Sequence, residues 1–285
     1  HGKIISLAYK CHHCKETIVK PVQNINYDLH STYEGHLWKP SFDLSKLTSI
    51  SKTTLEKLGG HDISTLLTGR KFEILLVIYD IIMLLPEPYK KLFLFAFIQS
   101  THLTTKMCAA RGKKSKRPLS TSWGRPAYMA LNRFMEQNPM IQLTRAFHSN
   151  AGLLKALHLF EKEIGMYTVA HSIDSTNVNG IAIQADAKEA KHYPKADFII
   201  TDPPYGNIIQ YGELSIIWNI WLTNAYPHYT IHLDHEVILN ESSTRKQYEQ
   251  MLTVIFRNCY NSLKDGKTMI FTFNSKDADD WGSLK

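Results

Sequence analysis

Hydrophobic and polar residues recur with two different periods along this chain, and the period changes near Gly165. From Thr53 to Ile98 apolar residues return every three or four positions, which predicts amphipathic helices. Pro86 and Pro88 separate two strongly apolar helices, and a further helix is expected to end at Gly165. Residues 1 to about 45 show neither period, which predicts a small appended module.

Beyond Gly165, short β-rich runs alternate with helical patterns. Three runs, ending at Asp186, Asp202 and Phe273, are typical of buried parallel strands. Two helices are expected between the last two runs, and the second is expected to stop at a C-cap glycine, Gly266. This order predicts an α/β fold with a Rossmann-like, doubly wound sheet. Ligands bind such sheets beyond the carboxyl ends of the strands, where Asp186 and Asp202 fall.

Composition narrows the class of protein. The chain has 285 residues, 44% of them hydrophobic, which is enough for a substantial core. Its longest apolar run, Ile74 to Leu85, is interrupted by Asp80 and is shorter than the ~20 residues that span a bilayer. We therefore expect no membrane partner and a cytoplasmic location. Four cysteines are too few for a disulfide scaffold, which favours reduced thiols.

The net charge of +7 is concentrated in one segment. From Pro88 to Met135 there are ten Lys and Arg residues and no Asp or Glu, so the rest of the chain carries −3. A localised basic block is typical of a surface that faces a polyanion, although a solvated loop without a partner is about equally compatible with a charge run. Arg125 is expected either to make an ordered DNA contact or to pack on Trp123. We predict that five basic residues of the block bind nucleic acid: Lys113, Lys114, Lys116, Arg117 and Arg125.

The N-terminal module contains "CHHC". Cys11 and Cys14 have the two-residue spacing of a zinc knuckle, but tetrahedral zinc takes four ligands and no second Cys-x-x-Cys is present. A metal-free pair remains an alternative. The remaining ligands are expected from an upstream pair or from nearby histidines: His12, His13, His30 and His36.

The most informative stretch is "ADFIITDPPYG". Pro203 and Pro204 fix φ and lack backbone donors, so the chain leaves the strand in a rigid turn that offers carbonyl acceptors. Asp202 adds a carboxylate, and Tyr205 adds an aromatic face beside it. Acceptors next to a flat ring suit a planar base that carries an exocyclic amine. A surface turn with a structural tyrosine is the alternative interpretation.

"TDPPYG" after an apolar strand resembles the catalytic motif of the amino-methyltransferases, which use S-adenosylmethionine to methylate exocyclic amines of bases. "SWGRPAYMALNRFMEQNP", "LFLFAFIQSTHLTTKM" and, more loosely, "YKCHHCKE" resemble the adenine-specific DNA methylases that carry a zinc ribbon. The resemblance implies that Asp202 and the Pro203 carbonyl accept the target amine and that Tyr205 stacks on a flipped adenine. It also implies that Asp186 approaches the cofactor.

The sequence pattern divides the chain into three parts, and the resemblance implies a role for each. Residues 1–45 are expected to form a zinc-ribbon-like module, 46–165 a helical, nucleic-acid-binding region, and 166–285 the catalytic half.

Trp218 and Trp221 are expected in the core, and Glu213 is expected to complement the dipole of its helix.

The glycine-rich turn that grips S-adenosylmethionine in this fold is missing. The fourteen glycines include no Gly-x-Gly. We therefore expect an incomplete sheet, with the cofactor loop supplied by an upstream segment or a second chain. The main hypothesis is an adenine-specific DNA methyltransferase, which would fit a restriction-modification context. RNA or cytosine methylation and a non-catalytic nucleic-acid-binding subunit remain alternatives.

Overall fold

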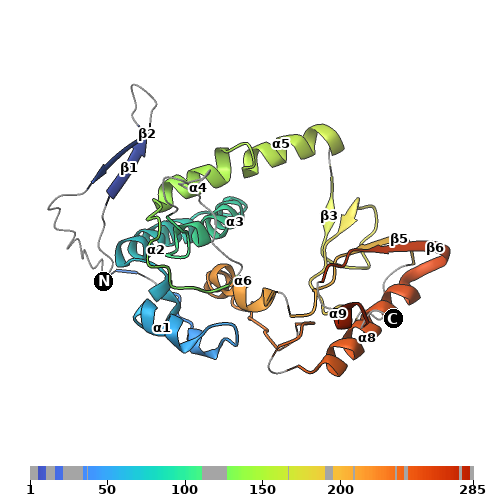
Figure 1. Ribbon diagram of the computed structural model, residues 1–285. Coiled ribbons are helices and arrows are strands. Elements are labelled where there is room, and N and C mark those ends of the chain that lie inside the picture. The colour runs from blue at the N-terminus through green and yellow to red at the C-terminus, as the bar shows by residue number, and fades with distance from the viewer. Residues whose placement is uncertain are drawn as a thin grey trace.

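A computed structural model of the chain defines the fold for most of the sequence. Between residues 6 and 21 it describes only the backbone of two strands. The other described ranges are 35–36, 38–110, 127–165, 167–189, 195–207, 209–234, 236–240, 243–275 and 278–282. The architecture is mixed α/β, as the sequence predicts. Helices gather in one part of the molecule, and strands β3 to β6 with α8 and α9 form another (Figure 1).

The helical part follows the predicted periodicity closely. Helix α1 begins after Ser51, whose side chain caps it, and ends at Gly59 in a left-handed conformation (φ 81°). The expected helix end at Gly165 is confirmed. The helices of this part are α1 (Lys52–Leu58), α2 (Gly69–Met83), α3 (Tyr89–Thr101), α4 (Pro139–His148) and α5 (Leu153–Ile164), with 3-10 turns η1 (Leu44–Lys46), η2 (Ile63–Leu66) and η3 (His102–Thr104).

The helices share one apolar core that also includes the chain after the Asp-Pro-Pro-Tyr turn. Helix α6 (Tyr211–Asn219) and the short α7 (Leu222–Ala225) pack against this core, although they belong to 166–285 by sequence. Tyr79, Phe97 and Trp221 are almost completely buried and lie ring against ring, and the Tyr79 hydroxyl donates to the Trp221 carbonyl at 2.9 Å. The predicted core position of Trp221 is therefore confirmed, and Trp218 is partly buried against the same core.

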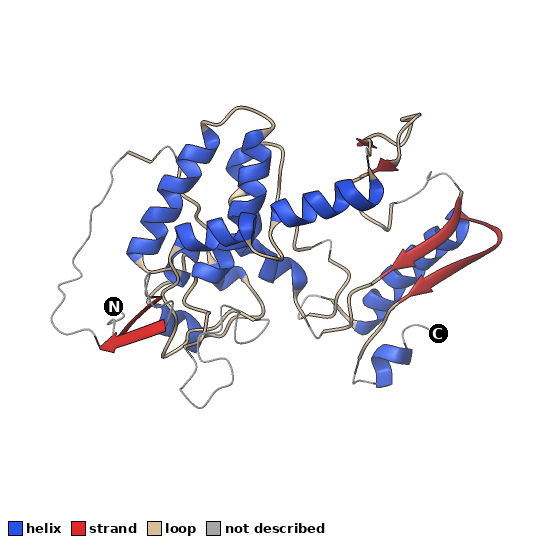
Figure 2. Cartoon of the chain, turned by 90° about the horizontal axis from the view of Figure 1, so that it is seen from above, coloured by secondary structure: helices blue, strands red, loops and turns tan. Residues whose placement is uncertain are grey.

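The strands in the described part of the chain form three separate pairs. Strands β1 (Ser6–Lys10) and β2 (Thr17–Pro21) are antiparallel, whereas β3 (Val169–Ala170) with β4 (Gly180–Ile181) and β5 (Ala196–Thr201) with β6 (Leu263–Phe271) are parallel. Helix α8 (Arg245–Ser262) packs against β6, and Figure 2 shows it along one face of the β5–β6 pair. The parallel pair joined through α8 agrees with the predicted crossover, although a complete Rossmann-like sheet does not follow from two strands.

Two details of the predicted strands were wrong. The run ending at Asp186 forms a strand only at Gly180–Ile181, because β3 pairs with just these two residues and the chain then turns. Gly266 is not the C-cap of a helix, because α8 already ends at Ser262. It lies within β6 with φ 72°, where the register between β5 and β6 shifts.

Helix α9 (Ala278–Gly282) is short and lies next to the turn that follows β5. None of the helices in the described ranges is both long enough and apolar enough to cross a bilayer.

Candidate active site at the Asp-Pro-Pro-Tyr turn

The predicted acceptor turn lies where β5 ends, beside the end of β6. The Asp202 carboxylate is exposed, and its Oδ1 accepts hydrogen bonds from two hydroxyls, those of Tyr205 and Thr272. Thr272 reaches Asp202 because its backbone N–H donates to the Thr201 carbonyl at 3.1 Å, which continues the parallel pairing by one residue. Both donors bind the same oxygen, and no hydrogen bond to Oδ2 is found among the described residues.

The hydrogen bonds also shift the pKa values of Asp202 and Tyr205. Donation from Thr272, and then from Tyr205, holds the pKa of the Asp202 carboxyl below its usual 3.8. The bond to Asp202 raises the pKa of the Tyr205 phenol above its usual 10.0. At neutral pH the turn therefore presents an ionised carboxylate and a protonated tyrosine, which is an acceptor beside an intact aromatic ring.

Aromatic rings continue from the turn toward the C-terminal helix. The Tyr205 ring lies edge to face with Phe273, at a centroid distance of 5.4 Å, and Phe273 lies edge to face with Trp281 at 5.1 Å. Trp281 is 46% exposed. Tyr211, at the start of α6, lies close enough that its pKa is raised, first by burial and then by Tyr205 and Asp202. The acceptor carboxylate is therefore surrounded by aromatic side chains.

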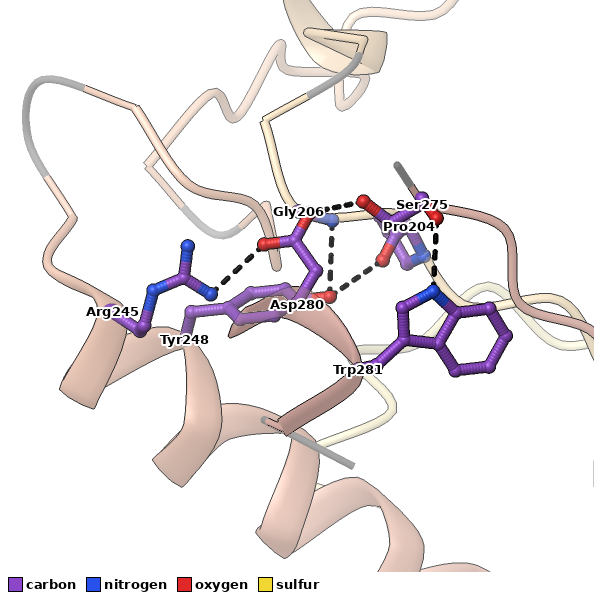
Figure 3. A network of polar contacts seen from close by, with 7 residues as sticks. All are labelled: Pro204, Gly206, Arg245, Tyr248, Ser275, Asp280 and Trp281. Carbon is purple, nitrogen blue, oxygen red and sulfur yellow. Dashed lines mark hydrogen bonds and ion pairs between the residues drawn. The ribbon is translucent and has the colours of Figure 1, made fainter. Parts of the chain in front are cut away.

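The backbone of the turn is held from below by α8 and α9 (Figure 3). The Tyr248 hydroxyl donates to the Pro204 carbonyl at 2.9 Å and accepts from the Gly206 N–H at 3.2 Å. Gly206 has φ 54°, and a Cβ there would overlap the carboxylate of Asp280. Glycine is therefore required at the end of "DPPYG" for two reasons, backbone conformation and space.

Asp186, the predicted cofactor residue, is bonded within its own loop. Its carboxylate accepts the Lys188 N–H at 2.9 Å and pairs with the Lys188 ammonium at 3.4 Å. Asn258 of α8 anchors the same loop by donating to the Ala187 and Lys188 carbonyls. No hydrogen bond or ion pair joins Asp186 to Asp202 or Tyr205 within the ranges described. The carboxylate is thus engaged with its own loop, and its approach to the cofactor stays a prediction.

Other predicted site residues fall outside the described ranges. These are the predicted zinc ligands Cys11 and Cys14 and the five basic residues Lys113, Lys114, Lys116, Arg117 and Arg125. No metal-binding group of three or more His, Cys, Asp or Glu residues occurs among the described side chains. His36, one of the histidines proposed to complete a zinc site, has both ring nitrogens hydrogen-bonded to carboxylates.

Sequence reasoning missed the residues that hold the turn. Thr272, Tyr248 and Asp280 lie 70, 44 and 74 positions from Asp202, Pro204 and Gly206, so no local pattern links them. The sequence offered one signal, for Thr272, which is the polar residue of "FTF" in "KTMIFTFNSK". The carboxyl end of a parallel strand next to β5 lies beside Asp202, so a polar residue there could have been expected near the carboxylate.

Searches against protein-family models, curated proteins and solved structures find no match to this chain.

Proposed function

We propose that this chain is the base-accepting part of an S-adenosylmethionine-dependent DNA methyltransferase that acts on the exocyclic amine of a flipped adenine. The observation that carries the proposal is the exposed, ionised Asp202 beside the Tyr205 ring at the carboxyl end of a parallel strand. This is where ligands bind in open α/β sheets.

In the proposed reaction these residues only bind and orient the target amine. In the proposal, Oδ2 of Asp202 and the Pro203 carbonyl accept the two N–H groups of the amine and orient its lone pair. The Pro204 carbonyl already accepts one hydrogen bond from Tyr248, which supports the choice of Pro203 as the acceptor of the amine. Tyr205 would stack on the base, as aromatic side chains do in base-flipping enzymes.

The cofactor would supply the methyl group. Asp186, which pairs with Lys188, stays the proposed contact to the cofactor, but the sequence has no Gly-x-Gly turn to hold S-adenosylmethionine. The proposal therefore includes an upstream segment or a second chain that holds the cofactor.

The test is methyl transfer by the full-length protein from labelled S-adenosylmethionine to unmethylated duplex DNA. We expect Asp202→Ala and Tyr205→Ala each to lower the rate by roughly 10²–10³-fold, the usual loss when a transition-state contact is removed. Asp197→Ala is the matched control, since Asp197 lies on the same strand with its side chain 61% exposed and pairs only with lysines on β6. The control should keep the wild-type rate.

Digestion of the product to nucleosides separates the alternatives. N6-methyladenine from DNA supports the proposal, whereas a methylated cytosine or a methylated RNA substrate would replace it by the corresponding amino-methyltransferase. Transfer at the wild-type rate by both Asp202→Ala and Tyr205→Ala would remove the turn from the reaction. Absence of transfer with any substrate would favour a non-catalytic binding subunit.

A further inference from the structure

The Tyr248 side chain joins α8 to the acceptor turn through a single buried hydroxyl. Tyr248 is completely buried in the first turn of α8, just after the capping box formed by Thr244 and Gln247. Its hydroxyl donates to the Pro204 carbonyl and accepts from the Gly206 N–H. These two groups belong to the peptide units on either side of Tyr205.

This arrangement fixes the backbone on which the Tyr205 ring depends. A residue's φ and ψ are the rotations between its two flanking peptide units, so holding both units in place fixes both angles. The prolines restrict φ only at positions 203 and 204. Without Tyr248, only side-chain contacts, the hydrogen bond of the Tyr205 hydroxyl to Asp202 and the ring contact with Phe273, would orient Tyr205 among the described residues.

A second set of polar contacts, centred on Asp280, joins α8 and α9 next to Gly206. Asp280 is buried below Gly206, and its two oxygens accept from Arg245 at 2.9 Å and from Ser275 at 2.7 Å (Figure 3). Arg245 is in α8 and Asp280 in α9, so the ion pair ties the two helices together under the turn. The Trp281 indole N–H donates to the Ser275 carbonyl at 2.9 Å and closes the network.

From these contacts we infer that Tyr248 is a positioning residue for the proposed methyl transfer: it holds the Tyr205 ring and the turn carbonyls in the geometry that accepts the base. The inference rests on the proposed function. It adds a residue that touches neither substrate nor cofactor and acts through the two peptide units that flank Tyr205.

The experiment compares Tyr248→Phe with Tyr260→Phe in the full-length protein. Both variants lose one hydroxyl from α8, but Tyr260 is 77% exposed and far from the turn along the helix. We expect Tyr248→Phe to lower kcat by roughly ten- to a hundredfold, the scale of a small misplacement of reacting groups, while KM for DNA changes by less than about threefold. Tyr260→Phe should match the wild type in both constants.

Hydrogen exchange supplies a readout that does not depend on activity. The Gly206 amide should exchange faster in Tyr248→Phe, because it loses its acceptor, and at the wild-type rate in Tyr260→Phe. Amide exchange and kcat are both measured well below the melting temperature of each variant. Nearly all of the protein is then folded, so a simple loss of stability leaves kcat unchanged.

The outcomes separate the two proposals. Faster Gly206 exchange together with a lower kcat supports positioning. A wild-type kcat for Tyr248→Phe in an active enzyme overturns the inference and leaves the proposed function intact. A wild-type protein without methyl transfer on any nucleic acid overturns the proposed function, and the positioning role falls with it.

Discussion

His36 shows at the scale of one residue how the fold changes the chemistry of a side chain. The imidazole is fully enclosed, with Nδ1 2.7 Å from an Asp80 oxygen and Nε2 2.7 Å from a Glu73 oxygen. Burial alone would lower the pKa of His36, but the hydrogen bonds to Asp80 and Glu73, with their charges, outweigh it and raise the pKa above 6.5. Both acids lie on α2, so the charged ring ties the segment before the helical region to that helix.

This arrangement predicts a pH-dependent contribution to stability. Because the folded pKa is raised, the contribution is complete below the unfolded value of about 6.5 and is lost as pH rises through the folded pKa. We expect His36→Ala to lower the free energy of unfolding by about 1–3 kcal/mol at about pH 5.5, and by less at about pH 8.5. Urea denaturation at the two pH values measures the difference.

His158→Ala, at an exposed position of α5, is the control for that experiment. Its effect on the free energy of unfolding should be small. A His36→Ala cost that is equal at both pH values would show that the ring is held as a neutral group.

Helix α6 illustrates the scale of secondary-structure elements. Its periodicity predicted the helix, and Glu213 was expected to complement the helix dipole. Glu213 does lie in the first turn of α6, and its buried carboxylate also accepts hydrogen bonds from the backbone N–H and hydroxyl groups of Thr48 and Ser49, in the loop before α1. Glu213 therefore joins the chain after the turn to the start of the helical region, across more than 160 residues of sequence.

Removing this acceptor should weaken the contact between α6 and that loop. We expect Glu213→Ala to lower the free energy of unfolding by about 2–4 kcal/mol, since two backbone N–H groups lose an ionised acceptor in a buried place. Chemical denaturation measures the loss. Glu56→Ala, at an exposed position of α1, should stay within about 0.5 kcal/mol of the wild type. Equal effects of the two changes would contradict a structural role for Glu213.

At the scale of the whole molecule, α8 lies along one face of the β5–β6 pair, where Phe271 is still 43% exposed, and the opposite face is more exposed. Phe271 contacts Phe256 of α8, with ring centroids 5.5 Å apart, so the residues that share its face point to the helix. The alternate positions on the opposite face include Ile200, which is 73% exposed, and Ile270, which is 50% exposed. Parallel strands are usually covered on both faces, so this apolar surface is unusual for such a sheet.

The difference between the two faces predicts that Ile199 and Ile200 contribute differently to the free energy of unfolding. Ile200→Thr should reduce the binding of a fluorescent hydrophobic dye and change the free energy of unfolding by less than about 0.5 kcal/mol. Ile199→Thr, on the helix-facing side of the same strand, should cost about 1–3 kcal/mol, because it places a hydroxyl in an apolar contact. Equal stability losses at the two positions would show that both faces are covered in solution.

Local pattern was sufficient for much of this protein. The apolar period of 3.6 residues predicts α2, α3, α5 and α8, because a helix needs only one apolar stripe and suitable ends. The Asp-Pro-Pro-Tyr turn could also be predicted, since the prolines and the glycine act through their own φ angles. The acceptor role of Asp202 follows from the same short segment and stays a prediction.

Tertiary structure alone decided which groups surround those segments. The strand predicted up to Asp186 depends on a pairing partner, and β3 offers only two residues, so the alternating pattern was not sufficient. The hydrogen bonds of Tyr248 to the turn and of Glu213 to Thr48 join residues about 40 to 165 positions apart. Such contacts form because packing of the apolar core brings the elements together, and the polar groups that become buried must then be paired. No short stretch of sequence contains that information.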